Sequence, residues 1–411
     1  MNKIIKNQIG LLKPSATLAI NEESNRLKKI GKKVFKFGFG QSPFPIPSNI
    51  VLELKNNANK NKYLPMQGLE ELKVAIASYL DKHNNNNFKS ENIIIGPGTK
   101  ELMFLTNIAF NGDILLPAPS WVSYQPQALI AKNKVHWIQT SSSSNWFPTA
   151  AQIENKVKSI KNKNILLFLN SPNNPSGTVC KNLKEISEVA KKYKLIILSD
   201  EIYSNLTFEG KYKSISNFYP EGTIVSSGLS KWCGAGGWRL GFFAIPDELK
   251  ELKKSLKILC SESFTSVSAP IQYAAIEAYT GDYSNYLEAV KKILSSIGMY
   301  TYENLKSNAI NVSKPEGGFY LFPEFVNAKF SSSSEMCKDI LEKTGVALLP
   351  GSDFGIESKK MVARLSYTDF EGETFLKNTI GRKMLDNADL KKYAPHIVEG
   401  VSKLKHWSNS L

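Results

Sequence analysis

The amino-acid sequence predicts an α/β protein that has a mainly parallel central sheet covered by helices and a smaller second part of α+β type. Two observations lead to this prediction. From about residue 93 to residue 225, short apolar runs alternate with amphipathic stretches, which is typical of strands and helices in a parallel sheet. After about residue 290, long helical patterns are separated by a few short strands. A chain of 411 residues is long enough for two domains.

In the first part, the short apolar runs are predicted to be buried strands, because they have the length of strands and lack helical periodicity. They cover residues 93–95, 114–116, 165–169, 195–198 and 223–225. Helical patterns lie between most of them, at residues 99–110, 120–132 and 183–193.

In the second part, helices are predicted at residues 286–307, 335–344 and 371–387, with strands near 319–322 and 361–366. The N-terminal stretch is expected to pack beside this part, and the tail after about Leu390 is left without an assignment. The predicted division is therefore a large domain over residues 46–290 and a small domain made of residues 1–45 and 291–411.

The bulk composition indicates a soluble protein, since 42% hydrophobic and 22% charged residues are ordinary values for globular chains. No run of 18 or more apolar residues predicts a membrane span, and the N-terminus lacks the apolar core of a signal peptide. We therefore expect a cytoplasmic protein with no membrane partner. The net charge of +15 is spread along the whole chain, which favours a solvated basic surface over a nucleic-acid site.

The cysteines and histidines give no indication of a metal site. The four cysteines are scattered without Cys-x-x-Cys spacing, which also argues against a disulfide framework and fits a reducing compartment. The four histidines form no pair at helical i, i+4 spacing. No metal ligand is proposed.

Four polar segments follow predicted strands, at the sheet edge where ligands bind in open α/β folds. The first, residues 96–100, contains Gly98, Thr99 and Lys100 at the start of a predicted helix. Backbone N–H groups at such a start favour an anion, although an ordinary strand-to-helix turn would look the same. The second, residues 171–178, holds Asn174 in a loop fixed by two prolines and a glycine, and a purely structural turn is its alternative.

The third and fourth segments contain ionisable groups. Asp200 and Tyr203 directly follow a buried strand, where a carboxylate is costly without a cationic or hydrogen-bonding partner. A helix N-cap is the alternative for Asp200. Residues 226–241 place Lys231 in a loop rich in serine and glycine, eight residues before Arg239. Such a lysine can be an amine nucleophile beside a fixed anion partner, whereas an inert exposed lysine is the usual alternative.

Together, in this order and spacing, the four segments resemble the class I/II aminotransferases of the pyridoxal-phosphate fold type I superfamily, the aspartate aminotransferase family. The resemblance extends from about Phe37 to Phe370. It implies a fold type I transferase that binds pyridoxal 5′-phosphate. Lys231 matches the lysine that links to the cofactor and later moves the substrate α-proton, and Asp200 matches the carboxylate that keeps the ring nitrogen protonated.

Further matches concern the rest of the cofactor. Tyr203 and Asn174 match the pair that hydrogen-bonds the 3′-oxygen, and Trp121, in the segment 119–124, matches the aromatic residue that stacks on the ring. A buried core tryptophan is the alternative for Trp121. The resemblance implies that the phosphate is held by the backbone of Gly98 and Thr99, the Thr99 hydroxyl and Arg239, with Ser230 as a weaker candidate. Lys100 is a further predicted cofactor-binding residue. Many relatives carry a serine where this chain has Gly228, so one hydroxyl contact is missing or comes from Ser227.

The substrate residues implied by the resemblance are Arg364, Gly40, Trp121 and Asn174. Arg364 matches the arginine that binds the α-carboxylate with its planar fork. Lys100 also aligns with a lysine that contacts the distal carboxylate of dicarboxylic substrates in one subgroup. Tyr63 matches a tyrosine that reaches the phosphate in the neighbouring subunit, which implies a homodimer with shared active sites.

The implied activity is amino-group transfer between an L-amino acid and a 2-oxo acid such as 2-oxoglutarate. Aspartate is the first candidate, and aromatic or other neutral amino acids are the next. A lyase or synthase on the same scaffold, for example a C–S lyase, would share every cofactor residue and stays as the alternative. A non-catalytic regulator with a DNA-binding module is disfavoured, because only about 35 residues precede the first motif.

Overall fold

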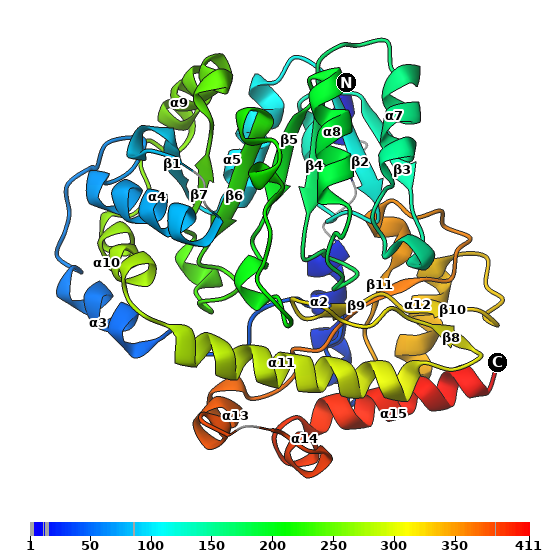
Figure 1. The fold of residues 1–411 in the computed structure, drawn as a ribbon. Helices are drawn as coiled ribbons and strands as arrows, with labels where there is room; N and C mark the ends of the chain where they lie inside the picture. Colours follow the sequence, from blue (N-terminus) through cyan, green and yellow to red (C-terminus); the bar gives the residue numbers. More distant parts are fainter. Residues whose placement is uncertain (1–3, 11, 13–15, 85–86, 383) are drawn as a thin grey trace.

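A seven-stranded sheet lies at the centre of the computed structural model, which describes residues 4–10, 12, 16–84, 87–382 and 384–411 (Figure 1). Neighbouring strands are parallel except where β7 pairs with β1 and with β6. In spatial order the strands are β1 (Ile93–Gly96), β7 (Gly241–Ala244), β6 (Thr223–Gly228), β5 (Ile196–Asp200), β4 (Ile165–Asn170), β2 (Asp113–Ala118) and β3 (Val135–Gln139). The predicted α/β class and mainly parallel sheet are confirmed, whereas β3 and β7 were not predicted.

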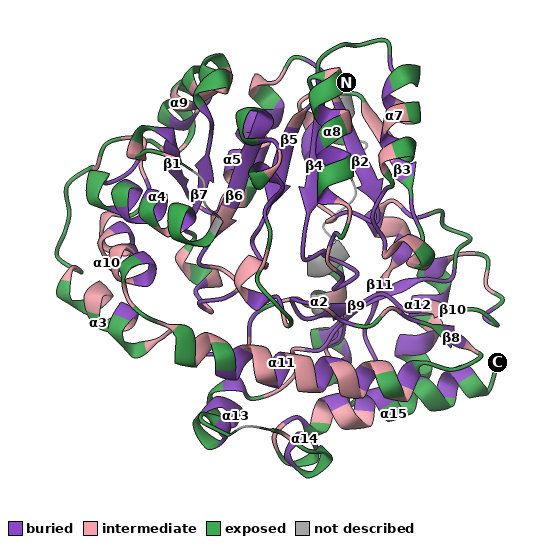
Figure 2. Cartoon of the chain, in the orientation of Figure 1, coloured by how far each residue is buried: buried purple, intermediate pink, exposed green. Residues whose placement is uncertain are grey.

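Helices cover both faces of this sheet because successive strand residues point to opposite sides. Ile114 and Leu116 pack against one group of helices, and Leu115 and Leu167 pack against another. Figure 2 shows these strands buried between helices whose outer surfaces are exposed. The first group is α5 (Thr99–Ala109), α6 (Tyr124–Ile130) and α9 (Lys250–Ser263); the second includes α7 (Ala150–Ser159) and α8 (Leu183–Tyr193).

A third group of helices covers the β1 end of the sheet. Leu72 and Ile76 from this group share a buried cluster with Ile93, Ile95 and Phe242. The group comprises α4 (Glu70–Asn84) and α10 (Ala269–Thr280), and α3 (Ser48–Asn56) packs against α10.

The C-terminal part is built around two small sheets. The strand order is β11-β12-β9 in one and β10-β8 in the other, and all of these pairs are antiparallel. The long helix α11 lies against α15, and α15 also packs on α12 (Figure 1). The strands are β8 (Ile310–Asn311), β9 (Tyr320–Leu321), β10 (Glu324–Phe325), β11 (Leu349–Pro350) and β12 (Ala363–Ser366). The helices are α11 (Ser284–Leu305), α12 (Ser333–Thr344), α13 (Gly372–Thr379), α14 (Asn387–Tyr393) and α15 (Pro395–Asn409).

The N-terminal segment lies against this C-terminal part, as expected. Phe35 forms a bridge with Val346, and α2 (Ala16–Lys29) contacts β11. The short helix α1 (Asn7–Gly10) precedes α2, and residues 1–3, 11 and 13–15 of the segment lie outside the described residues. The domain limits at 46 and 290 stay predictions, and α11 continues through residue 290 without a break.

Two predicted helices have different limits from those expected. The single helix predicted over 371–387 is wrong: α13 ends at Thr379, Gly381 follows with φ 80°, and α14 begins at Asn387. A left-handed glycine just after a helix is a common way to end it. The helix predicted from residue 120 begins only at Tyr124, and the tail after Leu390, which had no assignment, belongs to α14 and α15. Among the described residues, no helix has both the length and the apolar character needed to cross a membrane.

Candidate active site

The carboxyl ends of three neighbouring parallel strands form the floor of the candidate site. In the sheet register, Asn170 at the end of β4 pairs with Asp200 at the end of β5, and Asp200 pairs with Ser226 of β6. The loops that leave these strands contain Asn174, Tyr203 and Lys231. Parallel pairing therefore brings three of the four predicted segments to one edge of the sheet.

The amine of Lys231 lies in this site, on a partly buried side chain. Nζ donates to the carbonyl oxygen of Gly40 at 3.0 Å and lies 5.7 Å from the ring centre of Tyr203. Burial lowers the pKa of Lys231 to about 8, helped by the positive charge of Arg364 and opposed by Asp200. A useful fraction of this amine is thus uncharged near neutral pH, as a nucleophile requires.

Asp200 is a buried carboxylate that is 4% exposed. Burial raises its pKa to about 6, and a hydrogen bond from the hydroxyl of Tyr124 to Oδ2, 2.6 Å long, acts in the opposite direction. The backbone N–H of Ile202 lies 3.4 Å from Oδ1. Within the described part of the chain no cation lies within ion-pair distance of Asp200, so a protonated ring nitrogen is a suitable partner for it.

The turn before α5 is packed around an arginine. Gly98 has φ 89°, and a Cβ there would lie 2.3 Å from Nη2 of Arg239. Arg239 donates from Nη1 to the carbonyl oxygen of Gly236 at 3.0 Å and from Nη2 to that of Pro97 at 3.3 Å. A Cβ at Gly241 would lie 2.6 Å from the backbone nitrogen of Thr99. An exposed guanidinium is therefore held at a helix N-terminus, which is an arrangement suited to a phosphate.

Lys100 and Trp121 lie together beside this turn. Nζ of Lys100 is 5.5 Å from the ring centre of Trp121, and burial together with the charge of Arg239 lowers the pKa of Lys100. The ring of Trp121 meets that of Tyr124 edge to face, with centres 5.4 Å apart. Trp121 is only partly buried, so it is not the fully enclosed core tryptophan of the alternative interpretation.

Arg364 is an almost completely buried arginine, 2% exposed, whose charge affects the pKa of Lys231. It donates from Nη1 to Oδ1 of Asn174 at 2.9 Å and from Nη2 to the carbonyl oxygen of Gly38 at 2.7 Å. Burial lowers its pKa, and its Nε has no hydrogen-bond partner among the described residues. A buried guanidinium bound to two neutral oxygens and with a spare donor can accept a carboxylate.

Two tyrosines, Tyr203 and Tyr320, lie beside Gly40. The hydroxyl groups of Tyr203 and Tyr320 are 3.0 Å apart, and the hydroxyl of Tyr320 donates to the carbonyl oxygen of Gly40 at 3.5 Å. A Cβ at Gly40 would lie 2.0 Å from Oη of Tyr320. Glycine is needed at position 40 because of this close approach.

Two of the predicted residues are not joined to the others by any contact in the described part of the chain. Tyr63, in the loop between α3 and α4, is 88% exposed. Ser230 adjoins Lys231, but its side chain makes no hydrogen bond there. A side chain at Gly228 would come within 2.7 Å of the carbonyl oxygen of Leu240, and the Ser227 hydroxyl donates to the carbonyl oxygen of Glu201 at 3.4 Å.

The sequence interpretation missed two residues of the site, Tyr124 and Tyr320, and also the buried Glu201 next to Asp200 in the chain. Glu201 is buried, accepts hydrogen bonds from Ser199 and Ser214, and has its pKa raised by burial to about 7. Tyr124 follows Trp121 by three residues, and Tyr320 follows two glycines in a predicted strand. Those positions were visible in the sequence, but which side chains the tyrosines touch depends on the tertiary fold.

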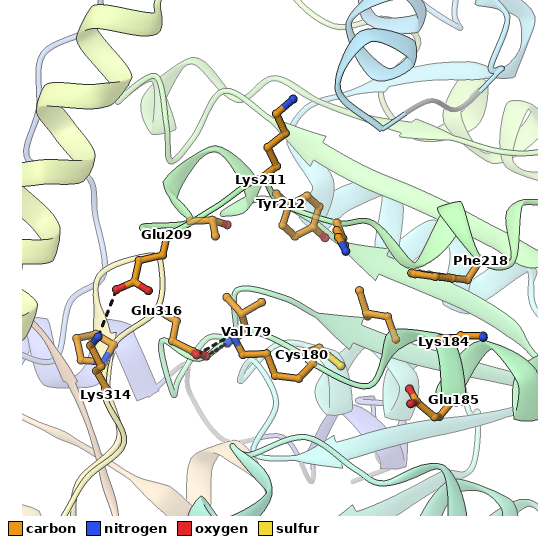
Figure 3. A pocket seen from close by; sticks show the side chains of 15 residues that line it. Val179, Cys180, Lys184, Glu185, Glu209, Lys211, Tyr212, Phe218, Lys314 and Glu316 are labelled. Carbon is orange, nitrogen blue, oxygen red and sulfur yellow. Dashed lines mark hydrogen bonds and ion pairs between the residues drawn. The ribbon is translucent and has the colours of Figure 1, made fainter.

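A separate surface pocket of about 400 Å³ lies outside this cluster, between residues 179–185, 207–218 and 314–316 (Figure 3). Figure 3 shows the ion pair between Lys314 and Glu209, 3.3 Å long, and the carboxylate of Glu316, which accepts from the backbone N–H of Val179 at 2.7 Å. Lys211 points away from the pocket in this view. None of the predicted site residues lines it, so we do not take it as the active site.

Comparison with known proteins agrees with this arrangement. The family model for aminotransferase class I and II matches residues 32–379. The aspartate aminotransferase of Bacillus sp. strain YM-2 is 33% identical over 383 residues, which cover 89% of this chain and 95% of that protein. The asparagine–oxo-acid transaminase of Streptococcus mutans is 32% identical over 373 residues, which cover 87% and 92% respectively.

Solved structures show the same fold. The aspartate aminotransferase of Thermotoga maritima superposes with a TM-score of 0.82 at 26% identity, covering 98% of this chain and 100% of that one. The aspartate aminotransferase of Thermus thermophilus with maleate gives a TM-score of 0.84 at 25% identity, covering 98% and 99%. The chain therefore belongs to the class I and II aminotransferases, and the reaction it catalyses is the transfer of an amino group.

Proposed function

We propose that this aminotransferase uses pyridoxal 5′-phosphate linked to Lys231, and that it transfers an amino group between L-aspartate and a 2-oxo acid such as 2-oxoglutarate. The observation that best supports the proposal is the Lys231 amine, which is held by the carbonyl oxygen of Gly40 and has a pKa of about 8 under the influence of burial, Arg364 and Asp200. When bound, the cofactor supplies a conjugated ring that takes up electrons from the substrate α-carbon.

The residues around Lys231 fit the parts of this cofactor. Arg239, with the backbone of Gly98 and Thr99 at the start of α5, is suited to the phosphate. Lys100 adds positive charge nearby, and Ser230 is assigned to the phosphate by its position beside Lys231 alone. Within the described part of the chain, Arg239 donates only to neutral carbonyl oxygens. Its positive charge has no anionic partner there, so it is available for the phosphate.

The ring would be held on its edges and on one face. The carboxylate of Asp200 would accept a hydrogen bond from the protonated ring nitrogen and stabilise its charge. Tyr203 and Asn174, both buried, would donate to the 3′-oxygen. Trp121 would cover one face of the ring, because its own ring is fixed by the edge contact with Tyr124.

The substrate would be bound by residues near Lys231 and deprotonated by Lys231 itself. Arg364 would receive the α-carboxylate, with Asn174, Gly40 and Trp121 beside it. Lys231 Nζ would then take the proton from the substrate α-carbon and deliver it to the cofactor carbon that carries the transferred nitrogen, since an amine with a pKa near 8 can both accept and donate a proton. The carbonyl oxygen of Gly40 holds Nζ in place at 3.0 Å.

Aspartate is proposed as the substrate because of the positive charge of Lys100 and because of the names of similar proteins. Lys100 lies over Trp121 and could receive a second carboxylate while Arg364 binds the first. The relative from Bacillus is named aspartate aminotransferase, and the Thermus enzyme was solved with maleate, a four-carbon dicarboxylate. A Lys100→Met variant should have a KM for aspartate raised about tenfold and an unchanged KM for a neutral amino acid, the size expected for one charged hydrogen bond.

The assembly and the location complete the proposal. We propose a homodimer with shared active sites, supported by the exposure of Tyr63, whose hydroxyl would reach the partner's phosphate site. A cytoplasmic location is supported by the four cysteines, which are buried free thiols.

The experiment is reconstitution with pyridoxal 5′-phosphate followed by a panel of amino acids, with absorbance and 2-oxo acid release as the measurements. The purified chain should form a borohydride-reducible link to the cofactor, and a Lys231→Ala variant should not. Amino acids that are substrates should bleach the visible absorbance and release the matching 2-oxo acid. A link that survives in Lys231→Ala would overturn the assignment of Lys231. Release of pyruvate and ammonia without an acceptor would instead support the lyase alternative.

A further inference from the structure

One buried tyrosine touches two of the proposed cofactor contacts at once. Tyr124 is 1% exposed and is the first residue of α6. Its hydroxyl donates to Oδ2 of Asp200 at 2.6 Å, and its ring meets that of Trp121 edge to face at 5.4 Å. The ring of Phe168, 4.8 Å away, supports it from the sheet. Among the described residues, no other side chain both hydrogen-bonds Asp200 and makes a ring contact with Trp121.

The surroundings of the Tyr124 hydroxyl indicate a role beyond packing. Apart from this hydroxyl, Tyr124 belongs to an apolar cluster with Leu116, Phe168 and Leu198. A hydroxyl is costly in such a cluster unless it is hydrogen-bonded, and phenylalanine would fill the same volume. The pKa of Tyr124 is well above its usual value because of burial and the nearby Asp200, so the phenol stays protonated and remains a donor.

The direction of this hydrogen bond matters for Asp200. Burial favours the neutral carboxylic acid, and the bond from Tyr124 favours the carboxylate. Other ionisable groups close enough to interact with Asp200 are Lys231, whose charge also favours the carboxylate, and Glu201, Tyr203 and Tyr212, whose own pKa values are affected by Asp200. Because Tyr124 binds Oδ2, Oδ1 remains available to a second donor. Among the described residues, Oδ1 has only a long contact of 3.4 Å with the Ile202 N–H.

We propose that Tyr124 is a positioning residue for the transfer reaction, which fixes the charged carboxylate of Asp200 for the ring nitrogen and holds Trp121 against the ring face. This inference rests on the proposed function, because it requires the cofactor ring to lie between those two residues. Tyr124 itself does not touch the cofactor or the substrate and acts through Asp200 and Trp121.

The test uses Tyr124→Phe, which removes the hydroxyl and keeps the ring, with Tyr279→Phe as a matched control. Tyr279 is also a buried tyrosine, 7% exposed, and its hydroxyl has no hydrogen-bond partner among the described residues. Three quantities are measured for each chain: the Kd of the apoprotein for pyridoxal 5′-phosphate, the pH midpoint of the visible band of the bound cofactor, and kcat and KM.

Tyr124→Phe should bind the cofactor about tenfold more weakly, the usual size of a lost hydrogen bond to a charged group. Its kcat should fall more than KM rises, because the ring nitrogen is stabilised less while Arg364 is unchanged. Without the donor, the pKa of Asp200 moves up, so the acid limb of the kcat profile should move to higher pH. Tyr279→Phe should leave all of these unchanged.

A double-mutant cycle with Asp200→Ala separates positioning from packing. If Tyr124 acts through Asp200, the weakening of cofactor binding by Tyr124→Phe should disappear in the Asp200→Ala background. An equal weakening in both backgrounds, results indistinguishable from Tyr279→Phe, or a Tyr124→Phe chain that fails to fold while Tyr279→Phe folds would each overturn the inference. Failure of the wild-type chain to link the cofactor at Lys231 would instead refute the proposed function.

Discussion

Arg364 donates from Nη1 to the amide oxygen of Asn174 at 2.9 Å, and both side chains are at most 5% exposed. The pair joins β12 to the loop that follows β4, so it connects the C-terminal part of the chain to the edge of the central sheet. The bond also directs the amide of Asn174, because an amide oxygen that accepts from Arg364 leaves the amide nitrogen free to donate on the other side. In the proposed site, one pair would thus orient both a donor for the cofactor and a cation for the substrate.

The first prediction concerns this guanidinium. Arg364→Lys keeps the charge but loses the planar fork, so it should raise the KM for the amino acid about 10- to 100-fold with a smaller change in kcat. Arg26→Lys is the control, since Arg26 pairs with Glu23 on the exposed surface of α2 and should have no effect. Steady-state kinetics measure both. An unchanged KM in Arg364→Lys would mean that the α-carboxylate binds elsewhere.

The second prediction concerns the turn beneath Arg239. Gly98→Ala would place a methyl group 2.3 Å from Nη2 of Arg239 and would strain a backbone with φ 89°. The variant should bind pyridoxal 5′-phosphate at least about tenfold more weakly, because Arg239 must move from the start of α5. Gly237→Ala is the matched control, since a Cβ there meets nothing within 4 Å. Cofactor titration of the two apoproteins gives the comparison, and equal Kd values would contradict a phosphate site at this turn.

The sequence predicted the central sheet well because its strands are buried on both faces and appear as continuous apolar runs. It missed β3, where only Ile138 is buried, and β7, whose four residues follow directly on the glycine-rich segment of Lys231. The prediction of one helix across Gly381 failed because a single glycine carries little weight in a periodic pattern, although here it adopts φ 80°. Strand and helix limits depend on such local conformations more than on periodicity.

For the candidate site, the sequence identified the groups that follow each strand but not the groups that support them. Lys231 and Asp200 could be predicted as candidates from the segments that follow the strands, and Arg364 from the family resemblance. Tyr124 was missed because its role comes from a contact with Asp200, 76 residues later in the chain. Glu201 was passed over for a similar reason, since its partner Ser214 lies in a loop that the sequence left without structure.

The third prediction concerns Glu201. Its folded-state pKa of about 7 exceeds the ordinary value of 4.5, so the folded chain binds a proton that the unfolded chain has lost. Its contribution to stability is therefore full below pH 4.5 and is lost as pH rises through about 7. Relative to Glu201→Gln, the wild-type chain should lose about 3 kcal/mol over this range and change little at higher pH.

Denaturant unfolding of the two apoproteins between pH 4.5 and pH 8 measures this difference. Any constant offset from the glutamine amide cancels, because only the pH dependence of the difference is used. A difference that does not vary with pH would show that Glu201 is ionised throughout, with Ser199, Ser214 and Tyr212 stabilising its charge.

The fourth prediction concerns Tyr63, which is 88% exposed in the single chain. If its hydroxyl acts in the partner's site, then a Tyr63→Ala chain and a Lys231→Ala chain each form homodimers with two defective sites. A mixed dimer has one site with both substitutions and one site with neither, so it should regain up to half of the wild-type activity per dimer. Co-expression with two different tags, followed by tandem purification, isolates the mixed dimer for assay. The control is a mixed dimer of Lys231→Ala with Asp200→Ala. Both residues belong to the same chain's own site, so each site of this dimer keeps one defect and activity should not recover. No recovery with Tyr63→Ala would mean that Tyr63 serves its own subunit or that the sites are not shared.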